Sequence, residues 1–180
     1  MKIESLKHYI YNEEFVTLSV QIYLIIESIC KDYPGYKKWF LEKQLPTIES
    51  DERNILFVKN NENKIIALAC LKKTDEEQKI CTLYVSEEYR NMNIGSQLVE
   101  KSIKWLENSK PLITISDYKF EMFEALIEKY DWQLTEAITG IYNEESKELC
   151  FNGTLNDKTK YYQKFLTCLT KRKSDLEKEN

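Results

Sequence analysis

The sequence contains few of the residues on which common catalytic and metal sites depend. Histidine occurs once in 180 residues, at His8, and the five cysteines form an odd set without a C-x-x-C pair. Such spacing supports neither a zinc site nor a disulfide framework, so we expect no metal and reduced, buried thiols. A lone histidine in an N-terminal segment with strand character also leaves a histidine-based nucleophilic triad without a convincing base.

Glycine and long apolar runs are also scarce. With four glycines, the chain has neither the G-x-G-x-x-G motif of dinucleotide-binding folds nor the triphosphate-binding G-x-x-x-x-G-K-[ST] loop. Its most apolar stretch, residues 20–29, is interrupted by polar residues and is too short to span a membrane. Residues 1–14 lack the basic-then-apolar pattern of a signal peptide. We therefore expect a cytoplasmic protein without membrane association.

Charge and length set two further bounds. The chain carries 26 basic and 30 acidic residues, and this balance disfavours a nucleic-acid partner. It is 42% hydrophobic, which at 180 residues is enough for one well-packed domain. We place that domain at residues 1–153. In residues 154–180 we expect an amphipathic helix and a charged tail, with the helix packed on its own domain or on a second subunit, as in a homodimer.

What the sequence does contain is a strand–loop–helix segment at residues 80–106. A β-rich apolar run ends in a polar turn, and a loop with Arg90, Asn93 and Gly95 leads directly into a helix with a periodic apolar face. The first N–H groups of a helix have no intrahelical partner and lie at the positive end of its dipole. This order predicts a phosphate site, to which Arg90 adds charge. An ordinary strand-to-helix connection is the alternative interpretation.

The loop resembles the R/Q-x-x-G-x-G/A signature of the GCN5-related N-acetyltransferases (GNAT), a family that uses acyl-CoA. Residues 89–96, Y-R-N-M-N-I-G-S, are similar to the family's common Y-R-G-K-G-I-G-S form. Asn93 replaces the first glycine of the pair. Because asparagine tolerates positive φ better than other non-glycine residues, we expect the loop to keep its shape.

The order of the expected elements around this loop is also similar to that of the GNAT family. Seven segments have the pattern of β-strands, at residues 3–10, 55–58, 65–71, 80–85, 112–115, 132–142 and 148–151. Helices are expected between them, at residues 12–29, 36–45, 96–106 and 119–130. The resemblance implies an α/β fold with a mixed sheet of about seven strands, in which the fourth and fifth strands splay apart.

The same resemblance implies how acetyl-CoA, the acyl donor, would bind. In the family the pantetheine arm lies between the splayed strands and pairs with backbone groups of the fourth, while the loop and the helix N-terminus hold the pyrophosphate. Ladder pairing and helix capping are the alternative roles of these residues. The strand contacts fall on Leu83, Tyr84 and Val85, and the loop contacts on Arg90, Asn91, Met92, Asn93, Ile94, Gly95 and Ser96.

Two catalytic residues that are common in the family are missing. Cys81 occupies the position of a glutamate in the fourth strand, and Ile127 that of a tyrosine in the last helix. Cys81 is expected to be a small buried residue, since nothing nearby in sequence would lower its pKa. Neighbouring hydroxyl and carboxyl groups are the candidates for proton transfer and acceptor orientation, with packing as their alternative role. These candidates are Tyr118, Tyr130, Tyr142, Ser116 and Asp117.

The resemblance places the acceptor site between the first two helices and the last hairpin, at residues 33–40 and 132–142. Both segments are rich in aromatic residues, which suit a small cationic amine but equally suit a packed core. The preferred function is an acetyl-CoA-dependent N-acetyltransferase that acts on a primary amine of a small molecule or protein. The missing catalytic residues motivate an alternative, a non-catalytic module that binds acyl-CoA or a partner protein. A toxin that acetylates aminoacyl-tRNA is disfavoured by the acidic balance.

Overall fold

A computed structural model describes residues 2–29 and 33–155 of the protein. Its centre is a sheet of seven strands: β1 (Ile3–Ser5), β2 (Arg53–Lys59), β3 (Ile65–Lys73), β4 (Gln78–Val85), β5 (Leu112–Ser116), β6 (Leu134–Thr139) and β7 (Lys147–Phe151). Their order is β1-β2-β3-β4-β5-β7-β6, and only the β4–β5 pair is parallel. This confirms the expected mixed sheet. The C-terminal helix expected in residues 154–180 lies outside the described residues.

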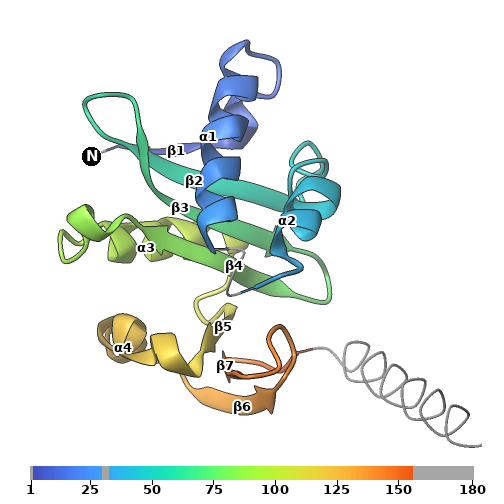
Figure 1. The fold of residues 1–180 in the computed structure, drawn as a ribbon, viewed down its shortest axis with the longest axis vertical. Coiled ribbons are helices and arrows are strands. Elements are labelled where there is room, and N and C mark those ends of the chain that lie inside the picture. The colour runs from blue at the N-terminus through green and yellow to red at the C-terminus, as the bar shows by residue number, and fades with distance from the viewer. Residues whose placement is uncertain (1, 30–32, 156–180) are drawn as a thin grey trace, which may run out of the picture.

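Helices cover both faces of this sheet: α1 (Glu14–Ile29), α2 (Tyr36–Trp39), α3 (Ile94–Leu106) and α4 (Phe120–Lys129). A π-helical turn over Phe40–Gln44 extends α2. We call the side of the sheet that contacts α1 and α2 the α1 face, and the side that contacts α3 and α4 the α3 face. In Figure 1, α1 and α2 lie in front of β2, β3 and β4. None of the described helices is long and apolar enough to cross a membrane.

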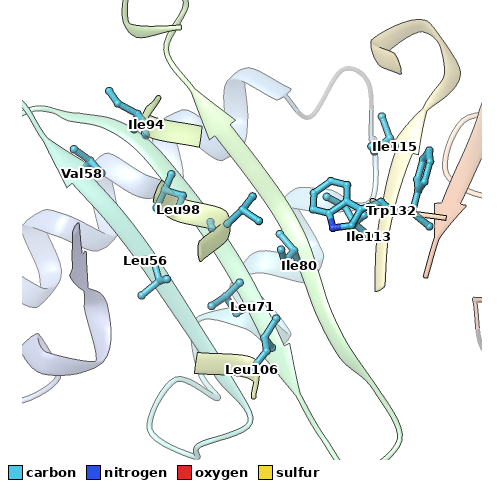
Figure 2. Close-up of a cluster of buried hydrophobic side chains, with 14 of the residues drawn as sticks. Leu56, Val58, Leu71, Ile80, Ile94, Leu98, Leu106, Ile113, Ile115 and Trp132 are labelled. Carbon is cyan, nitrogen blue, oxygen red and sulfur yellow. The ribbon is translucent and has the colours of Figure 1, made fainter. Parts of the chain in front are cut away.

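The core on the α3 face is built from apolar side chains at alternate strand positions. Leu71 on β3 and Ile80 on β4 are buried and pack with Leu98 of α3. Figure 2 shows that Trp132 and Ile113 extend this cluster toward β5. Each large apolar side chain that is fully buried contributes about 1.5–3 kcal/mol. The cluster therefore holds α3 firmly against the sheet.

On the α1 face, the spacing of apolar residues in α1 decides how the helix packs. Leu18, Ile22 and Ile26 follow one another at four-residue intervals, are all buried, and face β2 and β3. At the start of the helix, the Asn12 side chain accepts a hydrogen bond of 2.8 Å from the backbone N–H of Glu14. Asn12 therefore caps the start of α1.

The first strand is shorter than the sequence predicts. The expected strand over residues 3–10 is wrong in extent, because β1 ends at its third residue and Leu6–Tyr9 form a 3₁₀ helix. Leu6 is completely buried in the core of the α1 face, and the Tyr9 hydroxyl donates to the Glu4 carboxylate at 2.6 Å. Leu6 and Tyr9 are three residues apart, which matches the three residues per turn of a 3₁₀ helix rather than the alternation of a strand.

The parallel strands β4 and β5 diverge soon after they meet. Their register contains two pairs, Lys79 with Leu112 and Ile80 with Ile113. Figure 1 shows β5 turning away from β4 toward β7 and α4. The splay expected between the fourth and fifth strands is confirmed. As a result, β4 beyond Ile80 has no strand partner on its β5 side within the described residues.

Candidate functional site

The loop between β4 and α3 contains two asparagines in the left-handed conformation. Asn91 and Asn93 have φ angles of 63° and 60°, whereas Met92 between them has no positive φ. Such alternation turns successive backbone N–H groups toward one concave side, the form of a nest for anions. Both asparagine side chains are exposed, so their contribution to the fold is conformational. The expectation that Asn93 can adopt the positive φ of a glycine is confirmed.

The first turn of α3 contains backbone N–H groups that make no hydrogen bond within the described residues. Asn93 precedes the helix, and its side chain makes no capping hydrogen bond. The N–H of Gln97 donates to the Asn93 carbonyl at 3.1 Å, which begins the helical ladder. The N–H groups of Ile94, Gly95 and Ser96 thus lack partners within the described chain, at the positive end of a 13-residue helix. This arrangement suits a phosphate group.

Arg90 and Gly95 place the loop against the end of β4. The Nε of Arg90 donates to the Val85 carbonyl at 3.3 Å, which holds an exposed guanidinium group beside the strand end. A Cβ atom at Gly95 would lie 3.8 Å from Val85 Cγ2 and 4.0 Å from Leu126 Cδ1. The missing side chain of Gly95 therefore faces β4 and α4, and its absence allows α3 to pack closely against both.

Leu83, Tyr84 and Val85 occupy the part of β4 that β5 leaves unpaired. On their other side they pair with β3. The side chains of Leu83 and Val85 pack on the α3 face, and that of Tyr84 packs on the α1 face. The edge toward β5 therefore presents backbone groups, which can pair with an extended ligand as a further strand would.

Tyr130 connects the end of α4 to the first turns of α3. Its hydroxyl oxygen lies 3.0 Å from the Ser96 carbonyl oxygen and 3.2 Å from Glu100 Oε1, both of which are acceptors. Its ring stacks on Trp132 with the centroids 5.9 Å apart. Burial raises the pKa of Tyr130, so its hydroxyl stays protonated near neutral pH. This candidate thus lies against the helix whose N-terminus has unpaired N–H groups.

Tyr130→Phe is expected to lower the free energy of unfolding by about 1 kcal/mol, because it removes a hydrogen bond between two helices. In a protein of this size, the melting temperature should fall by about 2–4 °C. Tyr11→Phe is the matched control: the Tyr11 hydroxyl also donates to a carboxylate, but this residue is 91% exposed. Thermal melts compare the two, and equal melting temperatures would contradict the role given to Tyr130.

The connection between α1 and α2 meets the β6–β7 hairpin on the α1 face. The rings of Tyr33 and Tyr142 touch edge to face, with centroids 5.8 Å apart. Tyr36 continues the group, since its ring centroid lies 6.4 Å from that of Tyr33 and 4.8 Å from that of Trp39. The two aromatic segments expected at the acceptor site are therefore neighbours in space.

Three candidates lie together at the end of β5: Ser116, Asp117 and Tyr118. Ser116 is 1% exposed, and its hydroxyl has no hydrogen-bond partner in the part of the chain that is described. Tyr118 is 54% exposed, with the Lys119 ammonium nitrogen 5.4 Å from its ring centroid. Asp117 has a structural role, because its carboxylate accepts hydrogen bonds from the backbone N–H groups of Tyr118 and Lys147 at 3.0 and 3.4 Å.

Glu148 is a candidate that sequence reasoning missed. It is 1% exposed on β7, directly opposite Ser116. Neither of its carboxylate oxygens has a hydrogen bond of normal geometry within residues 2–29 and 33–155. Burial raises the pKa of Glu148, although the Tyr33 hydroxyl and the Lys79 ammonium pull it the other way. A signal was present, since strand alternation puts Glu148 on the same face as the buried Cys150.

The residues in place of the family's usual acid and base are unreactive. Burial raises the pKa of Cys81, which keeps its thiol protonated, as expected from the sequence. Ile127 packs into the core of the α3 face. Lys79, 7% exposed, is a second buried ionisable group: burial lowers its pKa, but its neighbours, Tyr142 foremost, outweigh burial and leave the pKa raised. Lys79 is therefore an ammonium at neutral pH.

Comparison with protein families agrees with this geometry. The model of the Acetyltransferase (GNAT) family matches residues 19–115, more than half of the 180-residue chain. The chain belongs to the GNAT acetyltransferase family. Acetyl-CoA is the acyl donor of this family, and the matched segment of this GNAT protein includes β4, α3 and the loop between them. No curated protein matches the sequence.

Solved structures show the same fold. The ribosomal-protein-S18-alanine N-acetyltransferase from Escherichia coli superposes with a TM-score of 0.62 at 17% identity, covering 83% of this chain and 90% of that one. A chain of the NatC complex bound to Gag peptide and CoA superposes with a TM-score of 0.62 at 18% identity, covering 84% of this chain and 97% of that one. A protein from Bacillus anthracis str. Ames that is described as a streptothricin acetyltransferase, in complex with acetyl coenzyme A, superposes with a TM-score of 0.53 at 15% identity. The match covers 61% of this chain and 67% of that one. At these identities the likeness concerns the fold alone.

Proposed function

We propose that this GNAT protein is an acetyl-CoA-dependent N-acetyltransferase that acts on a primary amine of a small molecule or protein. The observation that carries the proposal is the first turn of α3, which has no side-chain cap and follows a strand edge that has no partner among the described residues. Unpaired N–H groups at a helix start suit a pyrophosphate, and an open strand edge suits an extended amide-containing chain. Acetyl-CoA contains both parts.

The residues of the donor site are those of the loop and the open strand edge. Residues 90–96 would hold the pyrophosphate through backbone N–H groups and the Arg90 guanidinium, and the backbone of residues 83–85 would pair with the pantetheine arm. Bound acetyl-CoA supplies an activated acetyl group. Tyr130 supports this site indirectly, because its hydroxyl fixes the first turns of α3.

The acceptor amine would approach from the α1 face, where β5 ends. The buried hydroxyl of Ser116 lies there to orient the amine, and the more exposed hydroxyl of Tyr118 is available to supply a proton to the departing thiolate. Holding the two reactants in one orientation can by itself remove several kcal/mol of the barrier.

A charge reversal at Arg90 tests the donor site. Arg90→Glu is expected to weaken acetyl-CoA binding by about 10- to 100-fold, since a hydrogen bond to a charged group contributes about 1.5–3 kcal/mol. Titration calorimetry of the wild type and the variant with acetyl-CoA at physiological salt measures the change. The heat of binding should fit one site per chain.

Lys104→Glu is the matched control for this titration. Lys104 is exposed on the same helix, ten residues after its start, which is roughly 15 Å along the axis and beyond the Debye length of about 8 Å. The affinity of the Lys104→Glu variant for acetyl-CoA should stay within about twofold of that of the wild type. Equal losses in both variants would contradict the placement of the pyrophosphate at the loop. No binding by the wild type would refute the proposed activity.

A second function, a non-catalytic module that binds acyl-CoA or a partner protein, is favoured by one observation. The positions of the family's usual glutamate and tyrosine hold Cys81 and Ile127, neither of which offers a base or an acid at neutral pH. Such a module would bind acetyl-CoA saturably without turning over any member of a panel of amines.

A further inference from the structure

Two buried oxygen-bearing side chains face each other where β5 and β7 pair, and neither makes a hydrogen bond of normal geometry within the described residues. They are the Glu148 carboxylate and the Ser116 hydroxyl, both 1% exposed. We propose that Glu148 and Ser116 form the binding site for the ammonium group of the acetyl acceptor, and that Glu148 takes a proton from it. This inference rests on the proposed function and names the base and the substrate class for it.

Strand register puts both side chains on the α1 face. Ser116 and Glu148 are direct cross-strand partners, and the next pair in the ladder is Ile115 with Leu149. Ile115 and Leu149 pack in the core of the α3 face, so the alternation of side chains turns Ser116 and Glu148 the other way. Side chains of directly opposite residues start about 4.5–5.5 Å apart at Cβ. The two side chains therefore extend side by side from the same face of the sheet.

The chemistry of the pair calls for a hydrogen-bond donor. An ionised carboxylate only accepts hydrogen bonds, and a buried charge without a partner is strongly unfavourable. Buried unpaired polar atoms are rare in native proteins, and each calls for a specific reason. An alkylammonium group has three N–H donors and no acceptor, so it can satisfy Glu148 and Ser116 at once. A ligand that presents only oxygen acceptors cannot.

The surroundings of Glu148 limit the charge of the acceptor. Five groups act on it from the neighbouring elements: Lys79 on β4, Thr114 on β5, Lys119 after β5, Tyr33 before α2 and Tyr142 after β6. Two of these are cations, which offset the single carboxylate. A polyamine would bring several positive charges to this place, whereas one ammonium on an uncharged apolar body can lay that body against the rings of Tyr33 and Tyr142.

The transfer balances in protons and electrons. One N–H bond of the bound ammonium breaks as an O–H bond forms at Glu148, leaving a lone pair on nitrogen. Nitrogen then forms a bond to the acetyl carbonyl carbon, and the carbon–sulfur bond breaks with its electron pair on sulfur. The second proton lost by nitrogen ends on the thiolate, and Glu148 releases its proton to solvent. Because burial raises the pKa of Glu148 toward the working pH, the carboxylate is a more effective base than an exposed one.

Carbon NMR of protein with labelled glutamate carboxyl groups tests the site without acetyl-CoA. The Glu148 signal is the one that disappears in Glu148→Gln. Phenethylamine and an unblocked alanine-rich tetrapeptide amide represent a small amine and a protein N-terminus, and spermidine represents a polyamine. We expect at least one of the first two to shift the Glu148 signal saturably, and spermidine to bind at least about tenfold more weakly. If none of the three amines shifts this signal, or if spermidine binds best, the inference is overturned.

Kinetics with the amine that binds give the second readout. Glu148→Gln should lower kcat/KM by about 100-fold or more and remove the acidic limb of its pH profile, as loss of a general base does. Glu145→Gln, an exposed residue of the same hairpin, is the matched control and should keep that limb. Ser116→Ala, which leaves Glu148 in place, should weaken amine binding several-fold. An unchanged pH profile in Glu148→Gln refutes the base.

The titration with acetyl-CoA separates two kinds of failure. A protein that binds acetyl-CoA but shows no effect of Glu148→Gln on amine binding or on the pH profile leaves the proposed function intact and refutes this inference. A protein that does not bind acetyl-CoA refutes the proposed function itself.

Discussion

Alanine at both positions 91 and 93 is expected to weaken acetyl-CoA binding by about 30-fold or more. Asn91 and Asn93 have positive φ, and the left-handed conformation costs a residue such as alanine roughly 1–2 kcal/mol. The loop is exposed, so the free variant can relax to negative φ at both positions. Binding must then restore the strained loop, and about 2–4 kcal/mol for two residues appears as lost affinity, with each 1.4 kcal/mol equal to a factor of ten.

The double glycine variant is the control for this experiment. Glycine lacks the side chain of asparagine, but it adopts the left-handed conformation without a steric penalty. Its acetyl-CoA affinity should therefore stay far above that of the alanine variant, with similar melting temperatures for both. Calorimetric titration of the wild type, the double alanine variant and the double glycine variant with acetyl-CoA measures the order of their affinities. If alanine and glycine weaken binding equally, the asparagine side chains act through contacts, and the conformational argument fails.

Residue type and local periodicity were enough to predict the loop between β4 and α3 and the two elements that flank it. The family pattern has a glycine at the position of Asn93, and Asn93 has a positive φ of 60°. Asparagine and aspartate are the non-glycine residues that adopt this conformation most easily, so the backbone shape could be expected from residue type. The strand before the loop and the helix after it also follow from local periodicity, and both are confirmed.

Local alternation indicates that Glu148 is buried, but its pairing with Ser116 could not be found in this way, because it depends on long-range strand order. The sequence predicts a closing hairpin, but it does not show that β7, rather than β6, lies next to β5. Only that order puts Glu148 opposite Ser116, 32 positions earlier in the chain. In a strand, moreover, a shift of one residue moves a side chain to the other face. Tyr130 is a similar case: its side of α4 is predictable, but its partner Ser96 is not.

The stability of the protein should fall with rising pH because of Glu148. Its pKa in the native protein is raised above the ordinary value of 4.5, so between these two values the native state keeps a proton that the unfolded chain has lost. Stability then decreases with pH across this window and is unaffected by Glu148 well below 4.5. Lys79 opposes this effect, because its positive charge lowers the pKa of Glu148.

Glu148→Gln is therefore expected to stabilise the protein at pH 8 by about 1–3 kcal/mol, because it replaces a buried carboxylate by a neutral amide, and to have little effect at pH 4, where the carboxyl group is itself neutral. Lys79→Met should act in the opposite direction and make the fall of stability with pH steeper. In the double variant the dependence on Lys79 should disappear, since the carboxylate on which it acts is absent. Urea unfolding of the wild type, the two single variants and the double variant at both pH values measures these differences.

Replacing a catalytic carboxylate that lies in a destabilising environment is expected to make the protein more stable and the reaction slower. Replacing a residue that serves only in packing would not have both effects. Equal stability of Glu148→Gln and wild type at pH 8 would show that Glu148 is already satisfied in the native protein and would remove the reason to place an ammonium beside it.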